Sequence, residues 1–371
     1  MPELPEVETV RRGLNRLIVG KTICSVTYDT AKSFPNTAVD VDHFVIGAKP
    51  TAVRRRAKVL LIELSTGYTL VTHLKMTGQL VYIGRAQHEG VARASGGGAD
   101  ALDLLRSKTE GQAPPERFGA GHPNDSLVGA LPDRSTRVII EFDAERIDNG
   151  LESATRKRRS AEQMVGELPS VSTAAVDAVD DQEIWRNFWL RQKAGHISPC
   201  LFFNDQRKFG WMRLIPTIEV PHIDFMQRVG PEPLEDTFTA AEFTSRIRRR
   251  NNTTIKAAVL DQTVLAGVGN IYADESLWGA KLHPAMRVRD ISDEQLALLL
   301  SEIKYVMNLS IEKGGSTDKN YVNAEGKRGS YIDFARVFRQ EGKPCSRCGT
   351  TIEKIRVAGR GTHICPNCQV Q

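Results

Sequence analysis

Hydrophobic positions near the N-terminus recur at helical spacing and then give way to patterns typical of strands. Within residues 3–19 apolar side chains return every three or four positions, and Gly20 is placed to end a helix. From about residue 22 to 82 short apolar runs predict strands, and strand character returns after residue 136. The expected strands are Thr22–Tyr28, Lys58–Leu64, Tyr68–Leu74, Thr136–Phe142, Leu201–Phe203 and Phe209–Leu214.

After Pro216 the pattern becomes helical, with Gly, Pro and Asn between the segments. The expected helices are Phe238–Arg250, Lys256–Asp261, Ile271–Ala280 and Ser292–Glu312. Residues 86–120 and 143–198 fit neither pattern, and we interpret both as insertions in a β-rich domain. Within the second, Ile184–Leu190 could form a helix or a small satellite core.

These elements predict an α+β protein of several domains, since 371 residues are too many for one small core. We expect an N-terminal β domain over residues 1–216 and a helical domain over 217–330. A small module over 331–371 completes the chain.

Composition excludes little beyond a membrane-spanning protein. The chain is 40% hydrophobic, 26% charged and carries a net charge of +5, which is compatible with nucleic acid without being diagnostic. Basic runs at 54–58, 156–159 and 246–250 could equally be solvated faces. No stretch is apolar enough to cross a membrane, and the acidic N-terminus is unlike a signal peptide, so we expect a cytoplasmic protein.

Four of the six cysteines lie in the last 27 residues, as two C-x-x-C pairs separated by sixteen residues. In a chain without a secretory signal this spacing indicates a metal site, and four thiolates close the coordination sphere of one structural Zn²⁺. The expected ligands are Cys345, Cys348, Cys365 and Cys368. The other two, Cys24 and Cys200, stand in apolar contexts and are predicted to be buried.

Pro2 is the most informative residue of the N-terminus. If Met1 is removed, its secondary amine becomes the chain terminus, and α-amino groups titrate near about 7.7–8.0. Such an amine can attack a sugar carbon at neutral pH, with Glu3 beside it to transfer the proton. The alternative is that Pro2 and Glu3 simply open a helix.

Two further motifs suit phosphate binding. Gly267–Asn270 lies between two predicted helices and would expose backbone N–H groups at a helix N-terminus. Arg360 stands between glycines at the expected tip of a zinc hairpin. An ordinary interhelical turn and an ordinary surface arginine are the alternatives.

Together these motifs resemble the formamidopyrimidine-DNA glycosylase family (Fpg, or MutM). The resemblance runs in order through 1–10, 56–58, 73–78, 205–210, 267–275 and the cysteine tail, and covers the chain outside 86–120 and 143–198. It implies an N-terminal β-sandwich flanked by helices, then a helix–two-turn–helix domain with a zinc ribbon. It also implies excision of oxidised purines from damaged double-stranded DNA, followed by β,δ-elimination, by a monomer in the bacterial cytoplasm.

The resemblance implies roles for individual residues. Pro2 matches the nucleophile that forms a Schiff base at C1′, and Glu3 the proton donor for opening of the sugar ring. Lys58 matches a lysine that holds a phosphate and assists β-elimination, and Arg360 the zinc-finger arginine linked to δ-elimination. Further DNA contacts are expected from His73, His122, Lys256 and Asn270.

A nucleotide extruded from the duplex leaves a hole in the base stack that side chains must fill. Met76, Arg207 and Phe209 match the three residues that fill it in the family. The loop 314–329 matches the region that closes over the flipped base. One departure is Gln206, which stands where the family usually has proline.

Two other functions remain open. The first is the sister family, endonuclease VIII, which removes oxidised pyrimidines; its N-terminus typically has glycine where this chain has Leu4. The second is a non-catalytic zinc-ribbon protein that binds DNA. Such a protein would need neither Pro2 nor Glu3.

Overall fold

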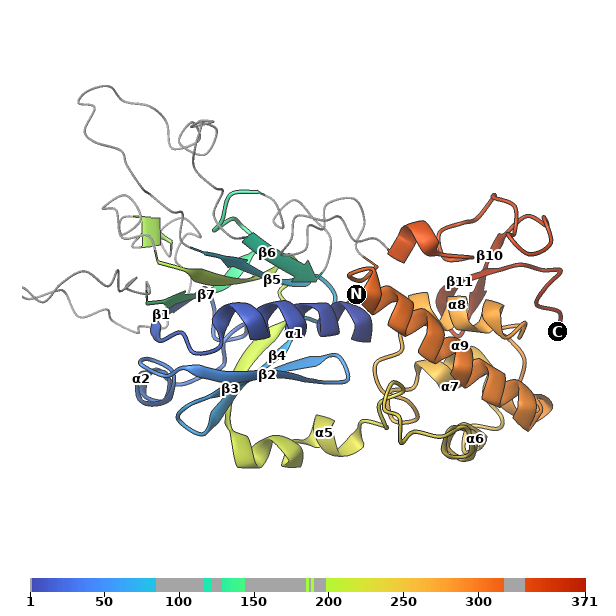
Figure 1. Cartoon of the computed structure of the whole chain (residues 1–371), viewed down its shortest axis with the longest axis horizontal. Helices are drawn as coiled ribbons and strands as arrows, with labels where there is room; N and C mark the ends of the chain where they lie inside the picture. The colour runs from blue at the N-terminus through green and yellow to red at the C-terminus, as the bar shows by residue number, and fades with distance from the viewer. Residues whose placement is uncertain are drawn as a thin grey trace, which may run out of the picture.

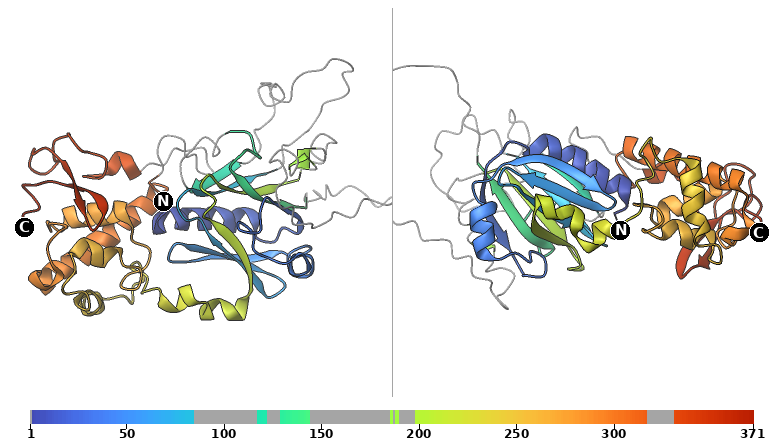
Figure 2. Two further views of the ribbon diagram at one scale, coloured as in Figure 1. Left: turned by 180° about the vertical axis from the view of Figure 1, so that it is seen from behind. Right: turned by 90° about the horizontal axis from the view of Figure 1, so that it is seen from below.

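The computed structural model describes residues 2–84, 117–121, 129–143, 185–186, 188–189, 198–316 and 331–371. These residues form two lobes (Figure 1), one built mainly of strands and the other mainly of helices. Figure 2 shows the N-terminus at the junction of the two lobes in both further views. The predicted α+β class is confirmed.

Two antiparallel sheets form the N-terminal lobe. The five-stranded sheet has the order β1 (Ile23–Tyr28), β7 (Thr136–Phe142), β8 (Cys200–Asp205), β5 (Gly78–Ile83) and β6 (Arg117–Gly121). The four-stranded sheet has the order β2 (Pro50–Arg56), β3 (Val59–Leu64), β4 (Tyr68–His73) and β9 (Trp211–Pro216). Buried residues of both sheets share one core, for example Leu70 and Leu80, so the lobe is a β-sandwich.

The strand β6 corrects the prediction that residues 86–120 form a polar insertion. Residues 117–121 pair with β5, and alternation along the strand buries Phe118 and Ala120 in the core. The strand was not predicted because Phe118 and Ala120 are its only apolar side chains and a glycine follows each of them. Phe118 covers Gly13 of the first helix so closely that a Cβ there would lie 2.0 Å from its ring.

The helix α1 (Leu4–Ile18) packs in the sandwich and also joins the two lobes (Figure 1). Its apolar residues Val7, Val10 and Leu14 belong to the core of the sandwich. One turn earlier, Leu4 belongs to the core of the helical lobe. The helix predicted over 3–19 is therefore confirmed, and its first turn lies where the lobes meet. The lobe also holds a short helix, α2 (Ala38–Phe44).

The helical lobe begins after residue 216. A 3₁₀ helix, η2 (Thr217–His222), and α5 (Asp224–Arg228) lie against the four-stranded sheet. The lobe proper contains α6 (Ala240–Arg248), α7 (Ile255–Leu260), α8 (Asn270–Gly279), η3 (Val288–Asp290), α9 (Asp293–Glu312) and η4 (Tyr331–Phe334). Ser292 and Gln295 cap α9 reciprocally. The four predicted helices are thus confirmed to within about two residues at each end.

A hairpin of β10 (Glu353–Val357) and β11 (Arg360–Ile364) completes the chain and packs against α8. Arg347 stacks on Trp278 of α8, with its guanidinium carbon 3.8 Å from the ring centre. This contact ties the cysteine module to the helical lobe.

The outer face of the five-stranded sheet carries a small apolar cluster. Trp185 and Phe188 pack there with Ile139 and Phe202, and Trp189 N donates to Trp185 O at 2.9 Å. Of the segment expected over Ile184–Leu190, the described residues Arg186, Phe188 and Trp189 are helical, and Trp185 and Phe188 belong to a satellite core. Cys200 is buried in this cluster, as predicted.

The prediction that Cys24 is buried is wrong. Cys24 is exposed because it lies at a bulge in β1, an edge strand. Its Sγ donates to Asp143 Oδ1 at 2.7 Å. Across the described parts of the chain, none of the helices combines the length and apolar character needed to span a membrane.

Candidate active site at the junction of the lobes

A cavity of about 680 Å³ lies where the two lobes meet. Its walls come from the start of α1, the β2–β3 turn, the turn before α8, and the β10–β11 hairpin. Six of the predicted site residues line it: Pro2, Glu3, Lys58, Met76, Asn270 and Arg360. Residues separated by more than 350 positions are therefore brought to one site.

The turn before α8 is shaped around the N-terminus of the chain. Gly267 has φ of +82°, and a Cβ there would lie 2.5 Å from Leu4 Cδ1. Leu4 N donates to Gly267 O at 3.1 Å. A Cβ on Gly269 would lie 2.2 Å from the carboxyl carbon of Glu3. Both glycines are thus required by close approach of residues 3 and 4.

The N-terminus of α8 receives the Glu3 carboxylate. Ile271 N donates to Glu3 Oε1 at 3.1 Å. An acidic group at this end of a helix is stabilised by the helix dipole and the free N–H groups. The turn predicted to bind phosphate therefore also positions Glu3 at the cavity.

Glu3 is a buried carboxyl with unused hydrogen-bonding capacity. It is 2% exposed, and its Oε2 has no hydrogen-bond partner among the described residues. Burial raises the pKa of Glu3 to about 7, Lys58 opposes this shift, and Glu6 adds to it. A carboxyl with this pKa can hold and release a proton at neutral pH.

Lys58 lies at the turn between β2 and β3, directly after Ala57, which has φ of +52°. Its Nζ donates to Val268 O at 3.0 Å, and the residue is 7% exposed. Burial lowers the pKa of Lys58, whereas the nearby Glu3 and Glu6 raise it. The ammonium group is therefore held within the cavity wall beside the carboxyl that it would assist.

Part of the basic run before Lys58 faces the helical lobe. Arg55 and Arg56 both contact the Glu232 carboxylate, at 2.7 and 3.2 Å. Ala57 N donates to the same carboxylate at 2.5 Å. These bonds fix the turn that presents Lys58. The two arginines are therefore used in contacts within the protein.

Glu6 is a residue that sequence analysis missed. Its Oε2 accepts from Glu3 N at 2.7 Å, and its Oε1 accepts from Tyr272 OH at 2.6 Å and Ser316 N at 2.8 Å. Glu6 therefore links the N-terminus, α8 and the start of the 314–329 loop. The available signal was its position three residues after Glu3, the spacing of a capping box.

Glu275 was also missed, although it ends the 267–275 motif. It is fully buried, and its carboxylate accepts the backbone N–H groups of Arg336, Val337 and Phe338 at 2.8–2.9 Å. Phe338 and the next residue, Arg339, line the cavity. Glu275 thus holds this wall of the cavity in place.

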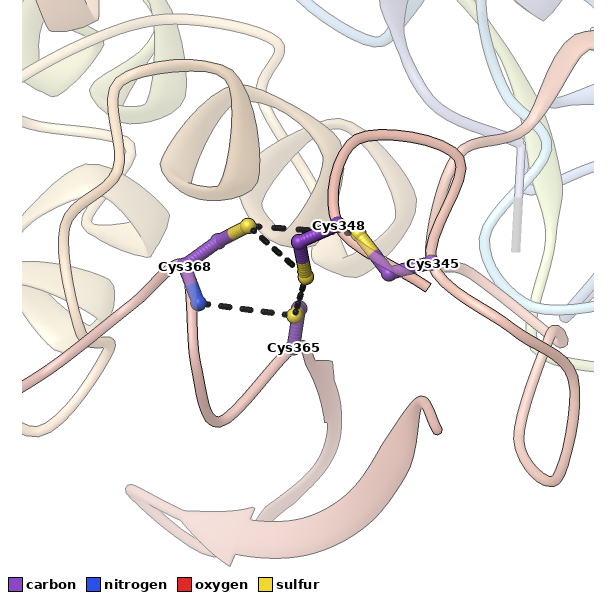
Figure 3. A group of neighbouring side chains, drawn as sticks. All are labelled: Cys345, Cys348, Cys365 and Cys368. Atoms are coloured by element: carbon purple, nitrogen blue, oxygen red, sulfur yellow. Dashed lines mark hydrogen bonds between the residues drawn. The ribbon is translucent and has the colours of Figure 1, made fainter. Parts of the chain in front are cut away.

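The four predicted cysteine ligands come together in the C-terminal module (Figure 3). Their sulfur atoms all lie within 4.8 Å of one another, and three of the six pairs are separated by 3.4, 3.5 and 4.0 Å. A disulfide would need about 2.05 Å. Sulfurs tetrahedrally placed about 2.3 Å from one zinc ion would be about 3.8 Å apart. The geometry fits one structural Zn²⁺ and confirms that prediction.

Asn270 and Arg360 both lie at the hairpin. Asn270 Nδ2 donates to Gly361 O at 3.0 Å, and its Oδ1 has no partner in the described part of the chain. Arg360 is exposed directly after the tight turn of the hairpin, close to its predicted place at the tip. Both residues line the cavity.

Lys256 requires a correction, because it is not placed to contact DNA. It is 0% exposed, and its Nζ donates to Asp274 Oδ1 at 2.6 Å, Thr362 Oγ1 at 2.6 Å and Gly361 O at 3.3 Å. All three ammonium protons are thereby used. The buried side chain of Lys256 on α7 thus links α8 and the β10–β11 hairpin.

The residues expected to fill the base stack lie on two loops. Met76 lines the cavity, and Phe209 is 45% exposed. The guanidinium carbon of Arg207 lies 4.9 Å from the centre of the Phe209 ring, and Lys32 Nζ lies 5.4 Å from it. Both cations attract the ring.

His73 lies at the end of β4 and accepts a hydrogen bond at Nδ1 from Lys75 N at 3.0 Å. Burial, with Lys75 and Lys58 nearby, lowers the pKa of His73 to about 3. The ring is therefore neutral at neutral pH, and its proton is on Nε2. His122 and residues 317–330 of the predicted loop lie outside the described residues.

Comparison with known proteins agrees with this architecture. Residues 1–151 match the formamidopyrimidine-DNA glycosylase N-terminal domain, and residues 229–321 match the formamidopyrimidine-DNA glycosylase H2TH domain. Residues 342–370 match the zinc finger found in FPG and IleRS. A formamidopyrimidine-DNA glycosylase of Pediococcus pentosaceus is 33% identical, covering 100% of this chain and 99% of its own. One from Herpetosiphon aurantiacus is 34% identical, covering 100% of both.

Solved structures show the same likeness. A complex between the Lactococcus lactis Fpg and DNA containing an abasic site has a TM-score of 0.68 and 26% identity, with 100% of both chains covered. A structure of MutM in complex with DNA containing carbocyclic 8-oxo-G has a TM-score of 0.67 and 26% identity, with the same coverage.

The fold and the cavity define a two-lobed protein with an H2TH domain and a zinc finger, and an ionisable site at the N-terminus of its first helix. The chain belongs to the formamidopyrimidine-DNA glycosylase family.

Proposed function

We propose that this protein is a bifunctional DNA glycosylase and abasic-site lyase that excises oxidised purines from duplex DNA. Its substrates are 8-oxoguanine and formamidopyrimidines, and it acts as a monomer in the bacterial cytoplasm. The observation that carries the proposal is Glu3, a buried carboxyl with a pKa of about 7 beside Pro2 in the interlobe cavity.

The chemistry begins at Pro2, whose nitrogen is free once Met1 is removed. The lone pair of the nitrogen attacks C1′ of the extruded nucleotide, and the glycosidic bond breaks with its electron pair going to the base. The departing base takes up the proton that the proline nitrogen loses, which restores the lone pair on that nitrogen. The nitrogen then expels O4′, which takes the proton of Glu3, and an iminium ion remains. Glu3, now a carboxylate, accepts a proton from C2′ as the C3′–O bond breaks and the 3′-phosphate leaves with the electron pair. Loss of a C4′ proton to solvent then breaks the C5′–O bond and releases the 5′-phosphate.

Phosphate groups would be held by donors on both sides of the cavity. Lys58 comes from the sandwich, and Asn270 and Arg360 come from the helical lobe and its hairpin. His73, which does not line the cavity, would donate from Nε2 to a phosphate farther along the backbone. Lys58 also stabilises the charge that develops during β-elimination. These contacts fix the backbone and leave base recognition to other groups.

The preference for purines rests on the residues that would fill the stack. Met76 supplies an unbranched apolar chain, Arg207 a cation for the unpaired opposite base, and Phe209 a ring that kinks the step. The exposed, cation-flanked position of Phe209 supports this assignment.

Borohydride reduction tests the proposal because it traps the iminium as a covalent protein–DNA adduct. We expect an adduct with duplex containing 8-oxoguanine, and its near loss in Pro2→Gly. Pro5→Ala, a change in the same turn of α1, serves as the matched control and should retain the adduct. Equal yields from wild-type and Pro2→Gly would overturn the role of Pro2.

The choice of lesion separates the remaining functions. Faster cleavage of thymine glycol than of 8-oxoguanine or formamidopyrimidine duplexes would assign the protein to the endonuclease VIII type. Binding of damaged duplex without cleavage or trapping would indicate a non-catalytic DNA-binding protein.

A further inference from the structure

Two loops carry the three side chains proposed to fill the base stack, and they come from different strand pairs. Met76 lies on the loop between β4 and β5, whereas Arg207 and Phe209 lie on the loop between β8 and β9. The loops meet at Asp205, the last residue of β8, which is 0% exposed. No role for Asp205 follows from the chemistry above.

The Asp205 carboxylate accepts hydrogen bonds from both loops. Oδ1 accepts from the Thr77 hydroxyl and from Arg207 N, the latter at 3.2 Å. Oδ2 accepts from Phe209 N at 2.8 Å and Gly210 N at 2.6 Å. Hydrogen bonds to a buried carboxylate are among the stronger ones in proteins. One side chain therefore fixes residues next to all three stack-filling groups.

The backbone of Asp205 is itself anchored to the sheet. Its N–H donates to Ser135 O at 2.7 Å, and its carbonyl accepts from Arg137 Nε at 2.8 Å. Asp205 also pairs in register with Gly78, which follows Thr77. The two loops are thus fastened to a rigid point.

Both loops contain a residue in the left-handed backbone region that favours glycine. Lys75 has φ of +51° and Lys208 has φ of +55°. Conformations of this kind persist only where the surrounding structure determines them. The bonds to Asp205 supply that constraint in the second loop even though Gln206 lacks the rigid ring of the family's usual proline.

We propose that Asp205 is a positioning residue that holds the Met76 loop and the Arg207–Phe209 loop as one rigid unit. The inference rests on the proposed function, because it concerns insertion of these side chains into the stack. Loops ordered before DNA binds do not lose that conformational freedom during extrusion. Without the carboxylate, the loops would have to be ordered as the nucleotide leaves the duplex.

Asp205→Asn tests the proposal at nearly constant volume. Asparagine keeps one acceptor oxygen but turns an NH₂ group toward N–H donors, so at least one pair of bonds is lost. The matched control is Glu141→Gln, which removes another buried carboxylate of the same sheet, one that accepts from the Ser25 hydroxyl on β1. Thermal unfolding of both full-length variants measures any general loss of stability.

The discriminating measurements compare an intact lesion with a preformed abasic site. For Asp205→Asn we expect single-turnover excision of 8-oxoguanine, and the fluorescence rise of a neighbouring 2-aminopurine, to slow about 10–100-fold. Borohydride trapping on a preformed abasic site, which has no base to extrude, should change less than about threefold. Glu141→Gln should leave all three measurements unchanged.

A double-mutant cycle shows whether Asp205 acts through the loops. In a Phe209→Ala background, adding Asp205→Asn should slow excision less than about threefold. The same slowing in both backgrounds, or equal slowing by Glu141→Gln, would overturn the proposal. If Asp205→Asn does not fold, Thr77→Val removes one donor and should slow excision of the lesion selectively.

The outcome also separates this inference from the proposed function. Wild-type protein that neither excises 8-oxoguanine nor traps an abasic site would contradict the function itself. Active wild-type protein with an equally active, folded Asp205→Asn variant would contradict only the role of Asp205.

Discussion

Two buried lysines lie near the junction of the lobes, and their surroundings differ sharply. Lys256 donates to Asp274, Thr362 and Gly361, so its charge and all its protons have partners. Lys58 donates to the Val268 carbonyl beside Glu3, whose Oε2 lacks a partner among the residues described. Burial lowers the pKa of both lysines.

The difference separates a structural group of charges from a reactive one. Around Lys256 every bond is made within the protein, and the group fastens the hairpin to the helices. Around Lys58 the two lobes leave hydrogen-bonding groups without protein partners at the wall of a cavity. This lowers the stability of the fold because buried polar atoms without partners are unfavourable. Such a cost is common where a site must bind and react.

The largest expected effect is on catalysis at Glu3. Glu3→Gln cannot transfer a proton, so single-turnover excision of 8-oxoguanine should fall about 10²–10⁴-fold. Binding of duplex containing an uncleavable abasic analogue, measured in parallel, should be nearly unchanged.

Glu8→Gln provides the matched control on the same helix. Burial opposes ionisation of Glu8, but hydrogen bonds from Arg11 and Arg12 lower its pKa to about 2. Glu8 is thus always ionised near neutral pH and unable to donate a proton there. An equal loss of excision in both variants would show that removal of any buried charge from α1 lowers activity. It would contradict a specific role of Glu3 in proton transfer.

The second effect concerns stability and should appear at the other lysine. Asp274→Asn leaves the Lys256 ammonium buried without its counter-ion, and should lower the free energy of unfolding by about 3–5 kcal/mol. Denaturant titration of the zinc-loaded protein measures this change. Asp224→Asn, at an exposed pair with Arg228, should cost less than about 1 kcal/mol. Comparable losses in the two variants would contradict the structural assignment of Lys256.

Sequence analysis predicted the elements whose periodicity is strong. Sequence alone was enough to predict the helix α1, the four helices after Pro216 and the cysteine site. Each of these patterns is typical of one kind of structure. The strand β6 was not, since two apolar residues among glycines give almost no alternating signal. Its burial is decided by Gly13, which lies about a hundred residues earlier and leaves room for Phe118.

The residues of the site could be predicted from the sequence, but their hydrogen-bond partners could not. Pro2, Glu3 and Lys58 could be named from motifs, yet the orphaned oxygen of Glu3 depends on how Gly269 approaches it in space. Lys256 was misassigned because a lysine at the start of a helix resembles a surface cation until Asp274 is seen beside it. Glu6 and Glu275 accept from backbone N–H groups far along the chain, and Asp205 accepts from the distant Thr77 hydroxyl. Local sequence does not reveal these partners.

The smallest effect is the pH dependence of stability that Glu3 contributes. Its pKa rises from an ordinary 4.5 to about 7 on folding, so the folded state holds a proton that the unfolded chain releases. This contribution is fully present below pH 4.5 and is lost as the pH rises to 7, by at most about 3 kcal/mol. In Glu3→Gln the loss should be absent, so the variant should gain stability relative to wild type between pH 5 and 8. Denaturant unfolding across this range measures the difference in free energy of unfolding between the variant and wild type. A difference that does not change with pH would mean that Glu3 has an ordinary pKa. The contrast between the two lysine sites would then rest on geometry alone.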